Sequence, residues 1–231
     1  MINALLAAGV DTNSQLNERR PSGQGGRFSD PLLSTGTTPL MRAIVNNDTE
    51  VAKALLEKGA NPNIYGMGTT PFLLAAGANP LAGRGGGGGA AAINVNTEIV
   101  DLMIQHGADV NSQVAGTTTY SARIARSPSN NSEGITALHA AVAANNPTMV
   151  RFLLDHGARV DVVDASGRTP MDVANGVPAR AATPGAGGAG VPAANINAPN
   201  TPGAGRGGGA RGASSEIRTM LLDAVPKKIT R

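Results

Sequence analysis

Residues Gly134 to Asp161 read GITALHAAVAANNPTMVRFLLDHGARVD, and this stretch decides the fold. Thr136 and Asn146 each stand just before an apolar run. Both side chains can accept a hydrogen bond from a first-turn backbone amide, so each residue is suited to begin a helix. Apolar residues then follow on one helical face, at Val150, Leu153 and Leu154. Gly157 suits a left-handed helix end. The stretch therefore predicts two short helices joined by a turn and followed by an extended crossing.

Both phrases of this stretch recur along the chain. The helix-start phrase occurs four times, as Gly36-Thr37-Thr38-Pro39-Leu40, Gly68-Thr69-Thr70-Pro71-Phe72, Gly134-Ile135-Thr136-Ala137-Leu138 and Gly167-Arg168-Thr169-Pro170-Met171. The phrase that ends the second helix occurs at 5–10, 55–60, 103–108 and 153–158, and Ile217 to Leu222 reads as a fifth second helix. A unit this small cannot bury its own apolar face and must stack on its neighbours. The pattern predicts an all-α solenoid with four first helices and five second helices.

The pattern resembles the ankyrin repeat, a β-turn finger plus two antiparallel helices every 33 residues. The resemblance is closest over 134–161 and 36–63 and covers about 140 residues of the chain. It implies stacked helix-turn-helix repeats with β-turn fingers, about four to five of them, the first incomplete. It also implies that His139 ties its finger to the next one by hydrogen bonds. A low aromatic content of 2%, with abundant Ala and Leu, agrees with thin stacked helix pairs.

The repeats divide the chain into segments, several of them interrupted. The expected order is a partial N-terminal repeat at 1–13, a long finger loop at 14–35, a repeat at 36–63, a repeat at 64–111 with a Gly-rich insertion at 77–95, a long finger loop at 112–133, a repeat at 134–163, a terminal repeat at 164–224 with an insertion at 177–213, and a tail at 225–231. Asn13-Ser14-Gln15 recurs as Asn111-Ser112-Gln113, so two repeats form a 98-residue unit. In the last insertion 26 of 37 residues are Ala, Gly or Pro. Such a composition buries too little apolar area to offset its ordering entropy, and we expect disorder there.

The sequence gives fewer indications about the N-terminal end of the array and about the cellular compartment. Met1 starts directly in a second helix, so we expect a fragment or a misassigned start, with Ile2, Leu5 and Leu6 half covered. The array should be monomeric unless this uncapped end pairs with another copy. There are no cysteines, no basic leader and no apolar run near the roughly 18 residues of a membrane span. We expect a soluble protein, cytoplasmic or, if a leader lies upstream, exported.

Catalytic, metal and cofactor sites are not expected, and the chain is not predicted to be an enzyme. His106 and His156 stand before a glycine at a helix end, where a partly protonated imidazole is favourable. The Gly83 to Gly89 run contains GxGxxG, but no strand precedes it and no Lys-Ser/Thr follows, so we interpret it as a linker. Arg84-Gly85-Gly86 and Arg206-Gly207-Gly208 resemble RNA-binding RGG elements without the usual aromatics. Nucleic-acid binding is therefore disfavoured.

Recognition of a protein partner remains, and the resemblance places it on the concave face of fingers and first helices. The first-helix row of exposed positions consists of Arg42, Leu74, Ala140 and Val173. The short finger adds Ile64, Tyr65 and Met67, and the long loop adds Arg123 and Arg126. Tyr and Met suit an adaptable interface, although Tyr65 could instead pack on the next finger. We expect a non-enzymatic protein–protein interaction module. The alternative is a nucleic-acid- or membrane-surface-associated protein that uses its basic Gly-rich loops.

Overall fold

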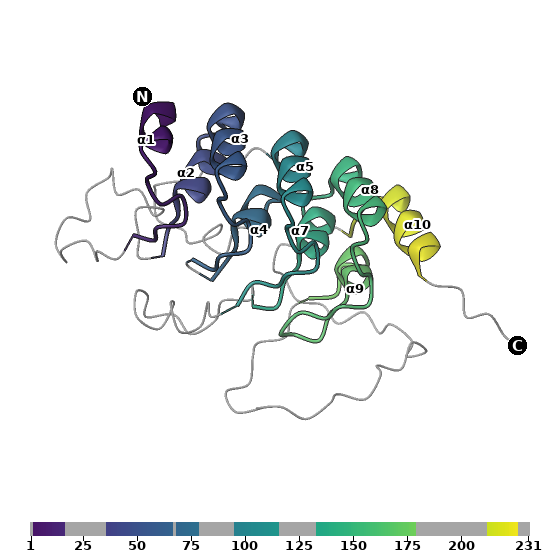
Figure 1. Ribbon diagram of the computed structural model, residues 1–231. Coiled ribbons are helices and arrows are strands. Elements are labelled where there is room, and N and C mark those ends of the chain that lie inside the picture. The colour runs from purple at the N-terminus through teal and green to yellow at the C-terminus, as the bar shows by residue number, and fades with distance from the viewer. Residues whose placement is uncertain are drawn as a thin grey trace, which may run out of the picture.

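The computed structural model describes residues 2–16, 36–66, 68–78, 95–115, 133–178 and 212–225. These residues form nine α-helices and no strand, arranged as a stack of two rows (Figure 1). The row of first helices contains α2 (Pro39–Val45), α4 (Pro71–Ala75), α7 (Ala137–Ala143) and α9 (Pro170–Ala174). The row of second helices contains α1 (Ile2–Ala7), α3 (Thr49–Glu57), α5 (Thr97–Gln105), α8 (Pro147–Asp155) and α10 (Ser215–Ala224). The expected all-α solenoid, with four first and five second helices, is confirmed.

Each first helix begins where its threonine predicts. Thr38, Thr70, Thr136 and Thr169 are all N-caps in extended conformation, and each side chain accepts a hydrogen bond from the backbone amide three residues later. Three of the four helices have proline in the first turn. The four threonines therefore occupy equivalent places on successive layers, as the repeat requires.

The second helices α3, α5 and α8 are capped by polar side chains and are each followed closely by a glycine. Asp48, Asn96 and Asn146 accept first-turn amide hydrogen bonds in α3, α5 and α8. The chain leaves α8 through Gly157, whose φ of +83° suits a residue without a Cβ. The turns between helices are also linked across layers, because the Asn96 amide donates to Asn47 Oδ1 at 3.1 Å. In the last repeat, Ser214 N donates to Asn145 Oδ1 at 2.9 Å.

The core is a single continuous cluster of small and medium apolar side chains between the two rows. Its largest fully buried members include Phe72, Leu73, Leu138 and Leu153. Helix packing is closest within the 98-residue units, where α2 packs on α4, α3 on α5, α7 on α9 and α8 on α10. Among the described residues, α4 with α7 and α5 with α8 make fewer close backbone approaches. The longer sequence period is thus visible in the packing as well.

The first helix of the stack is only partly covered. α1 packs on α3, Leu6 is half-buried against the core, and Leu5 is 51% exposed. The half-covered state expected for these two leucines is confirmed, while the Ile2 side chain lies outside the description. Most of the expected long loops at 14–35 and 112–133, the insertions at 77–95 and 177–213, and the tail lie outside the described residues. Within the described ranges, no helix is both long and apolar enough to cross a membrane.

Candidate interaction surface

Adjacent fingers are joined at their bases by a ladder of asparagine amides. The residues are Asn13, Asn63 and Asn111. Each Nδ2 donates to a glycine carbonyl of the next repeat, at Gly59 (2.9 Å), Gly107 (2.8 Å) and Gly157 (3.2 Å) respectively. Each Oδ1 accepts a hydrogen bond from the backbone amide two residues after that glycine. The donors are Asn61 (2.7 Å), Asp109 (2.8 Å) and Arg159 (2.8 Å). Because one planar amide makes both bonds, each asparagine fixes the spacing and the orientation of two neighbouring repeats.

Two glutamines hold the bases of the long loops. Gln15 Nε2 donates to the carbonyls of Gly36 (3.1 Å) and Tyr65 (2.8 Å). Gln113, 98 residues later, donates to the carbonyls of Gly134 (2.8 Å) and Val163 (3.0 Å). Backbone pairs close the same bases, between Leu16 and Gly36-Thr37 and between Val114 and Gly134-Ile135. This role of the two glutamines was not predicted, although the recurrence of Asn-Ser-Gln at 13–15 and 111–113 is its signal in the sequence.

Tyr65 lies on the short finger, between Gln15 and Gln113. Its side chain is held by a hydrogen bond and is also partly exposed. Its hydroxyl donates to the Gln113 carbonyl at 2.7 Å, while 46% of the residue remains exposed. Partial burial raises the pKa of the phenol. Ile64 beside it is half-buried. Met67, Arg123 and Arg126, the other finger and loop residues predicted to bind a partner, lie outside the described residues.

The first-helix row is less uniform than expected. Arg42, Ala140 and Val173 are half-buried, so part of each faces the surface. Leu74 was expected to be exposed, and this prediction is wrong, because the residue is 0% exposed. All five residues of α4 are buried, since this short helix packs against both α2 and α5. Leu74 therefore contributes to the core and offers no contact to a partner.

His139 joins the third repeat to the last finger. Its Nδ1 lies 2.8 Å from Thr136 Oγ1, and its Nε2 lies 3.0 Å from the Arg168 carbonyl. A carbonyl accepts only, so Nε2 carries the proton and Nδ1 is the acceptor for Thr136. Burial lowers the pKa of the imidazole. The tie between fingers that the resemblance implied is confirmed.

The other two histidines are helix C-caps. His106 caps α5 and His156 caps α8. The Nδ1 of His156 lies 2.7 Å from the Phe152 carbonyl, and its ring lies 4.3 Å from the Phe152 ring. Within the described ranges, no group of three or more His, Cys, Asp or Glu side chains is placed to hold a metal ion.

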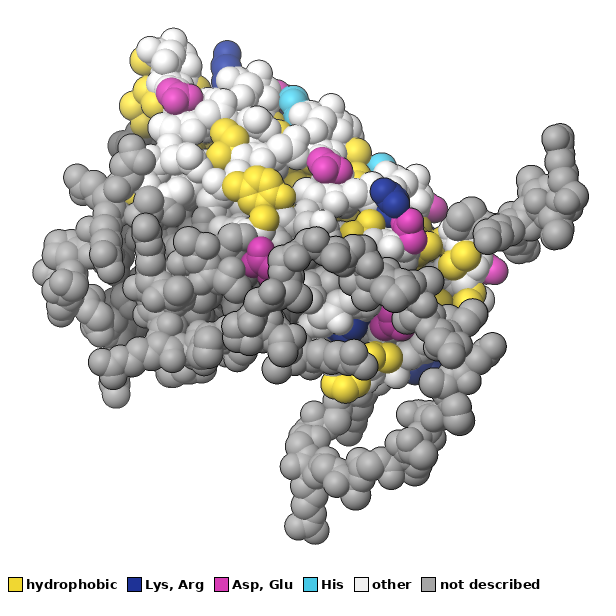
Figure 2. Space-filling view, turned by 90° about the horizontal axis from the view of Figure 1, so that it is seen from below, with side chains coloured by type: hydrophobic (Ala, Val, Ile, Leu, Met, Phe, Trp, Pro, Cys, Tyr) yellow, Lys and Arg dark blue, Asp and Glu magenta, His cyan; other side chains and the backbone are white. Residues whose placement is uncertain are grey.

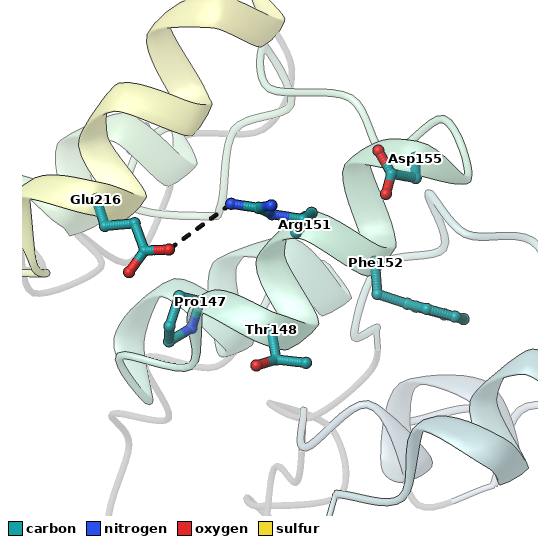
Figure 3. A pocket seen from close by; sticks show the side chains of 6 residues that line it. All are labelled: Pro147, Thr148, Arg151, Phe152, Asp155 and Glu216. Atoms are coloured by element: carbon teal, nitrogen blue, oxygen red, sulfur yellow. Dashed lines mark ion pairs between the residues drawn. The ribbon is translucent and has the colours of Figure 1, made fainter.

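An open pocket lies on the row of second helices, at α8 and α10 (Figure 3). It has a volume of about 420 Å³. Its lining consists of Pro147, Thr148, Arg151, Phe152 and Asp155 of α8 and Glu216 of α10. Figure 3 shows Arg151 pointing toward Glu216, with a 3.7 Å ion pair between them, and Phe152 pointing the other way. None of these residues was predicted from the sequence to form a site.

Charge is divided unevenly between the array and the rest of the chain. The described residues contain 14 of the 16 acidic residues but only seven of the 19 basic ones, a formal charge of −7. Figure 2 shows carboxylates dispersed among apolar groups along the described band. The net charge of +3 therefore combines an acidic array with a formal charge of +10 on the remaining segments, which hold 12 basic and two acidic residues.

Comparison with known proteins agrees with this architecture. A model of the ankyrin repeat matches residues 35–66, and a model of three ankyrin repeat copies matches residues 90–177. The chain belongs to the ankyrin repeat family. It is also similar to potassium channel AKT3 of Oryza sativa subsp. japonica, with 38% identity over 72 residues. That match covers 31% of this chain and only 6% of the channel protein.

Proposed function

We propose that the array binds a protein partner through its finger face, the surface formed by the fingers and the first helices. Ankyrin repeats are generally protein–protein interaction modules and are typically non-enzymatic. The site residues are Arg42, Ile64, Tyr65 and Met67, with Arg123 and Arg126 from the long loop. Leu74 is left out because it is buried.

The anchored, half-exposed Tyr65 carries this proposal. A hydrogen bond from its hydroxyl to the Gln113 carbonyl holds the ring in one orientation. Its own carbonyl is held by Gln15. A rigid aromatic side chain loses little conformational entropy on binding, which is why tyrosine is frequent among the residues that dominate interface energies. Val163 occupies the equivalent place on the last finger and is 48% exposed.

A photo-crosslinking experiment tests the finger face. A benzophenone amino acid is placed at Val163 on the finger face, and at Lys53 on the exposed surface of α3 as the matched control. We expect one discrete protein adduct from position 163 and none from position 53. The affinity of the adduct partner is then measured for Tyr65→Ala, which should weaken binding by about tenfold or more. Equal adducts from both positions, or unchanged affinity in Tyr65→Ala, would contradict the proposal.

A second function has an observation in its favour. Twelve of the 19 Lys and Arg residues lie outside the described array, including Arg180, Arg206 and Arg211 of the last insertion. Basic segments of this kind suit a nucleic acid or an anionic membrane surface. Steep loss of binding with added salt, together with loss on deletion of 179–211, would support this function. Partner binding that survives the deletion supports the finger face.

A further inference from the structure

The pocket between α8 and α10 has a chemistry of its own. We propose that it receives an arginine side chain from a basic segment of a partner protein. The pocket lies in the row of second helices, whereas the fingers project from the other side of the stack (Figure 1). The inference therefore does not depend on the finger face and can fail or succeed separately from it.

The apolar part of the pocket is specific to α8. Phe152 supplies an aromatic wall, where the aligned residue is Ala54 on α3 and Leu102 on α5. Thr148 stands where α3 and α5 carry the longer Glu50 and Glu98. A short side chain beside a large ring leaves a space with an aromatic surface. The aliphatic stem of an arginine can pack there, with its guanidinium over or beside the ring.

The polar part of the pocket has more negative than positive charge. Asp155 and Glu216 supply two carboxylates, and Asp155 makes no ion pair with any described residue. The one cation, Arg151, lies 3.7 Å from Glu216, and both side chains are more than half exposed. Such an exposed pair at long range contributes little. An incoming guanidinium can therefore share or replace Arg151 at Glu216, and Asp155 adds a second carboxylate to the lining.

Charge and shape together favour arginine over other occupants. A planar guanidinium both stacks on an aromatic ring and binds carboxylates through two parallel donors, which the ammonium of lysine cannot do. An anionic ligand would face an array with a formal charge of −7. The same charge steers a basic segment toward the array and raises its association rate.

Peptide titration of the full-length chain tests the assignment. The probe is a fluorescein-labelled peptide with two arginines separated by Gly-Ser spacers, compared with the same peptide carrying citrulline. Citrulline keeps the shape of arginine and removes its charge. Binding is followed by fluorescence anisotropy, and amide chemical shifts of ¹⁵N-labelled protein locate the site. We expect the largest shifts in residues 148–156 and 214–218, and about tenfold weaker binding of the citrulline peptide.

Two pairs of substitutions with the same change of charge distinguish binding in the pocket from general attraction of the peptide to the acidic array. Asp155→Asn with Glu216→Gln removes both pocket carboxylates, and both residues are exposed, so the fold should be retained. Glu50→Gln with Glu57→Gln makes the same change of charge on the exposed surface of α3. We expect about tenfold weaker binding for the pocket pair and less than about twofold for the α3 pair. Phe152→Leu should weaken the arginine peptide more than a lysine peptide, since the planar guanidinium stacks on the ring as well as being attracted by its charge.

Three results would overturn the proposal. One is equal weakening by the two pairs of substitutions, which would mean that the whole acidic array attracts the peptide. Another is a set of shifts that leaves 148–156 unchanged. The third is no peptide binding by the full chain together with binding after deletion of 179–211, which would make the chain's own basic insertion the occupant. Loss of partner binding in Tyr65→Ala with unchanged peptide binding would leave this pocket intact as a separate site.

Discussion

At the scale of single residues, the asparagine side chain donates one hydrogen bond and accepts another through a single planar amide. Asn63 donates through Nδ2 to Gly107 and accepts through Oδ1 from Asp109, each at 2.8 Å. Aspartate offers acceptors only, and alanine offers neither. The Asn ladder therefore depends on the identity of the residue and not on its polarity alone.

Substituting Asn63 should show this dependence. Asn63→Ala should lower the free energy of unfolding by about 1–2 kcal/mol, because two inter-repeat hydrogen bonds are lost at a partly exposed site. Asn63→Asp should cost a similar amount at neutral pH, because its carboxylate would face the Gly107 carbonyl. Urea unfolding followed by circular dichroism measures both. The exposed Gln105→Ala serves as control and should change stability by less than about 0.5 kcal/mol.

His139 should make stability depend on pH. Burial lowers its pKa below the ordinary 6.5. The unfolded chain therefore takes up the proton at a higher pH than the folded one, and stability is fully present above pH 6.5. It should fall as the pH drops below this value, until the folded state also binds the proton. Urea unfolding of the natural chain, measured at about pH 8, 7, 6 and 5, should show this decrease in the free energy of unfolding.

The comparison with His139→Gln isolates the histidine. Gln cannot titrate, so its stability should decline less between about pH 7 and pH 5. At high pH the variant should be the less stable protein, because His139 is buried and bonded to Thr136 and Arg168. Parallel pH curves for the two proteins would show that other groups cause the dependence.

At the scale of the element, helices this short depend on their caps. α4 has only five residues, and its N-cap Thr70 is fully buried. The Thr70 hydroxyl accepts from the Leu73 amide at 3.1 Å. A five-residue helix has almost no cooperative length of its own, so its stability comes from the cap and from tertiary packing.

Removing this cap should be costly. Thr70→Ala should lower the free energy of unfolding by about 1–2 kcal/mol, because it leaves a buried first-turn amide without its partner. Thr148→Ala, at an exposed first-turn position of α8, is the control and should stay within about 0.5 kcal/mol. Thermal or urea unfolding of the two variants decides the matter. Equal effects would mean that the caps add nothing beyond helix propensity.

At the scale of the whole molecule, stability should be distributed unevenly along the stack. A helix in a repeat array is stabilised by the neighbours on both sides. α3 packs on α2 and on α5, whereas the main contact of α1 is a smaller one with α3, and Leu5 is left half exposed. Local opening should therefore begin at the α1 end.

Hydrogen exchange followed by mass spectrometry measures this gradient. Amides of 2–7 should exchange at least about tenfold faster than those of 49–57 under native conditions. Leu55→Ala, at a buried position in α3, should lower global stability by about 2–5 kcal/mol. Leu5→Ala should have a much smaller effect. Equal protection of α1 and α3 would show that α1 has a partner surface that the described residues do not include.

Much of the fold was accessible from the sequence because its signals are local. The Thr-Pro starts, the polar caps and the glycine ends act within one helical turn, so the helices lie where these residues predict. The 98-residue period also predicted which repeats are alike. The candidate surface was predicted less well. Arg42 and Tyr65 are on the surface, but Leu74 is buried, because its exposure depends on how closely α4 packs against its neighbours.

The sequence by itself determined the repeat, the number of helix pairs and the residues that begin and end each helix, since these depend on short-range hydrogen bonding and apolar spacing. The tertiary structure alone decided the burial of Leu74, the two clamps made by Gln15 and Gln113, the anchoring of Tyr65 and the pocket beside Phe152. Each of these requires contacts between residues that are distant in the chain, such as the 48 positions from Tyr65 to Gln113. Their geometry exists only after the layers have stacked.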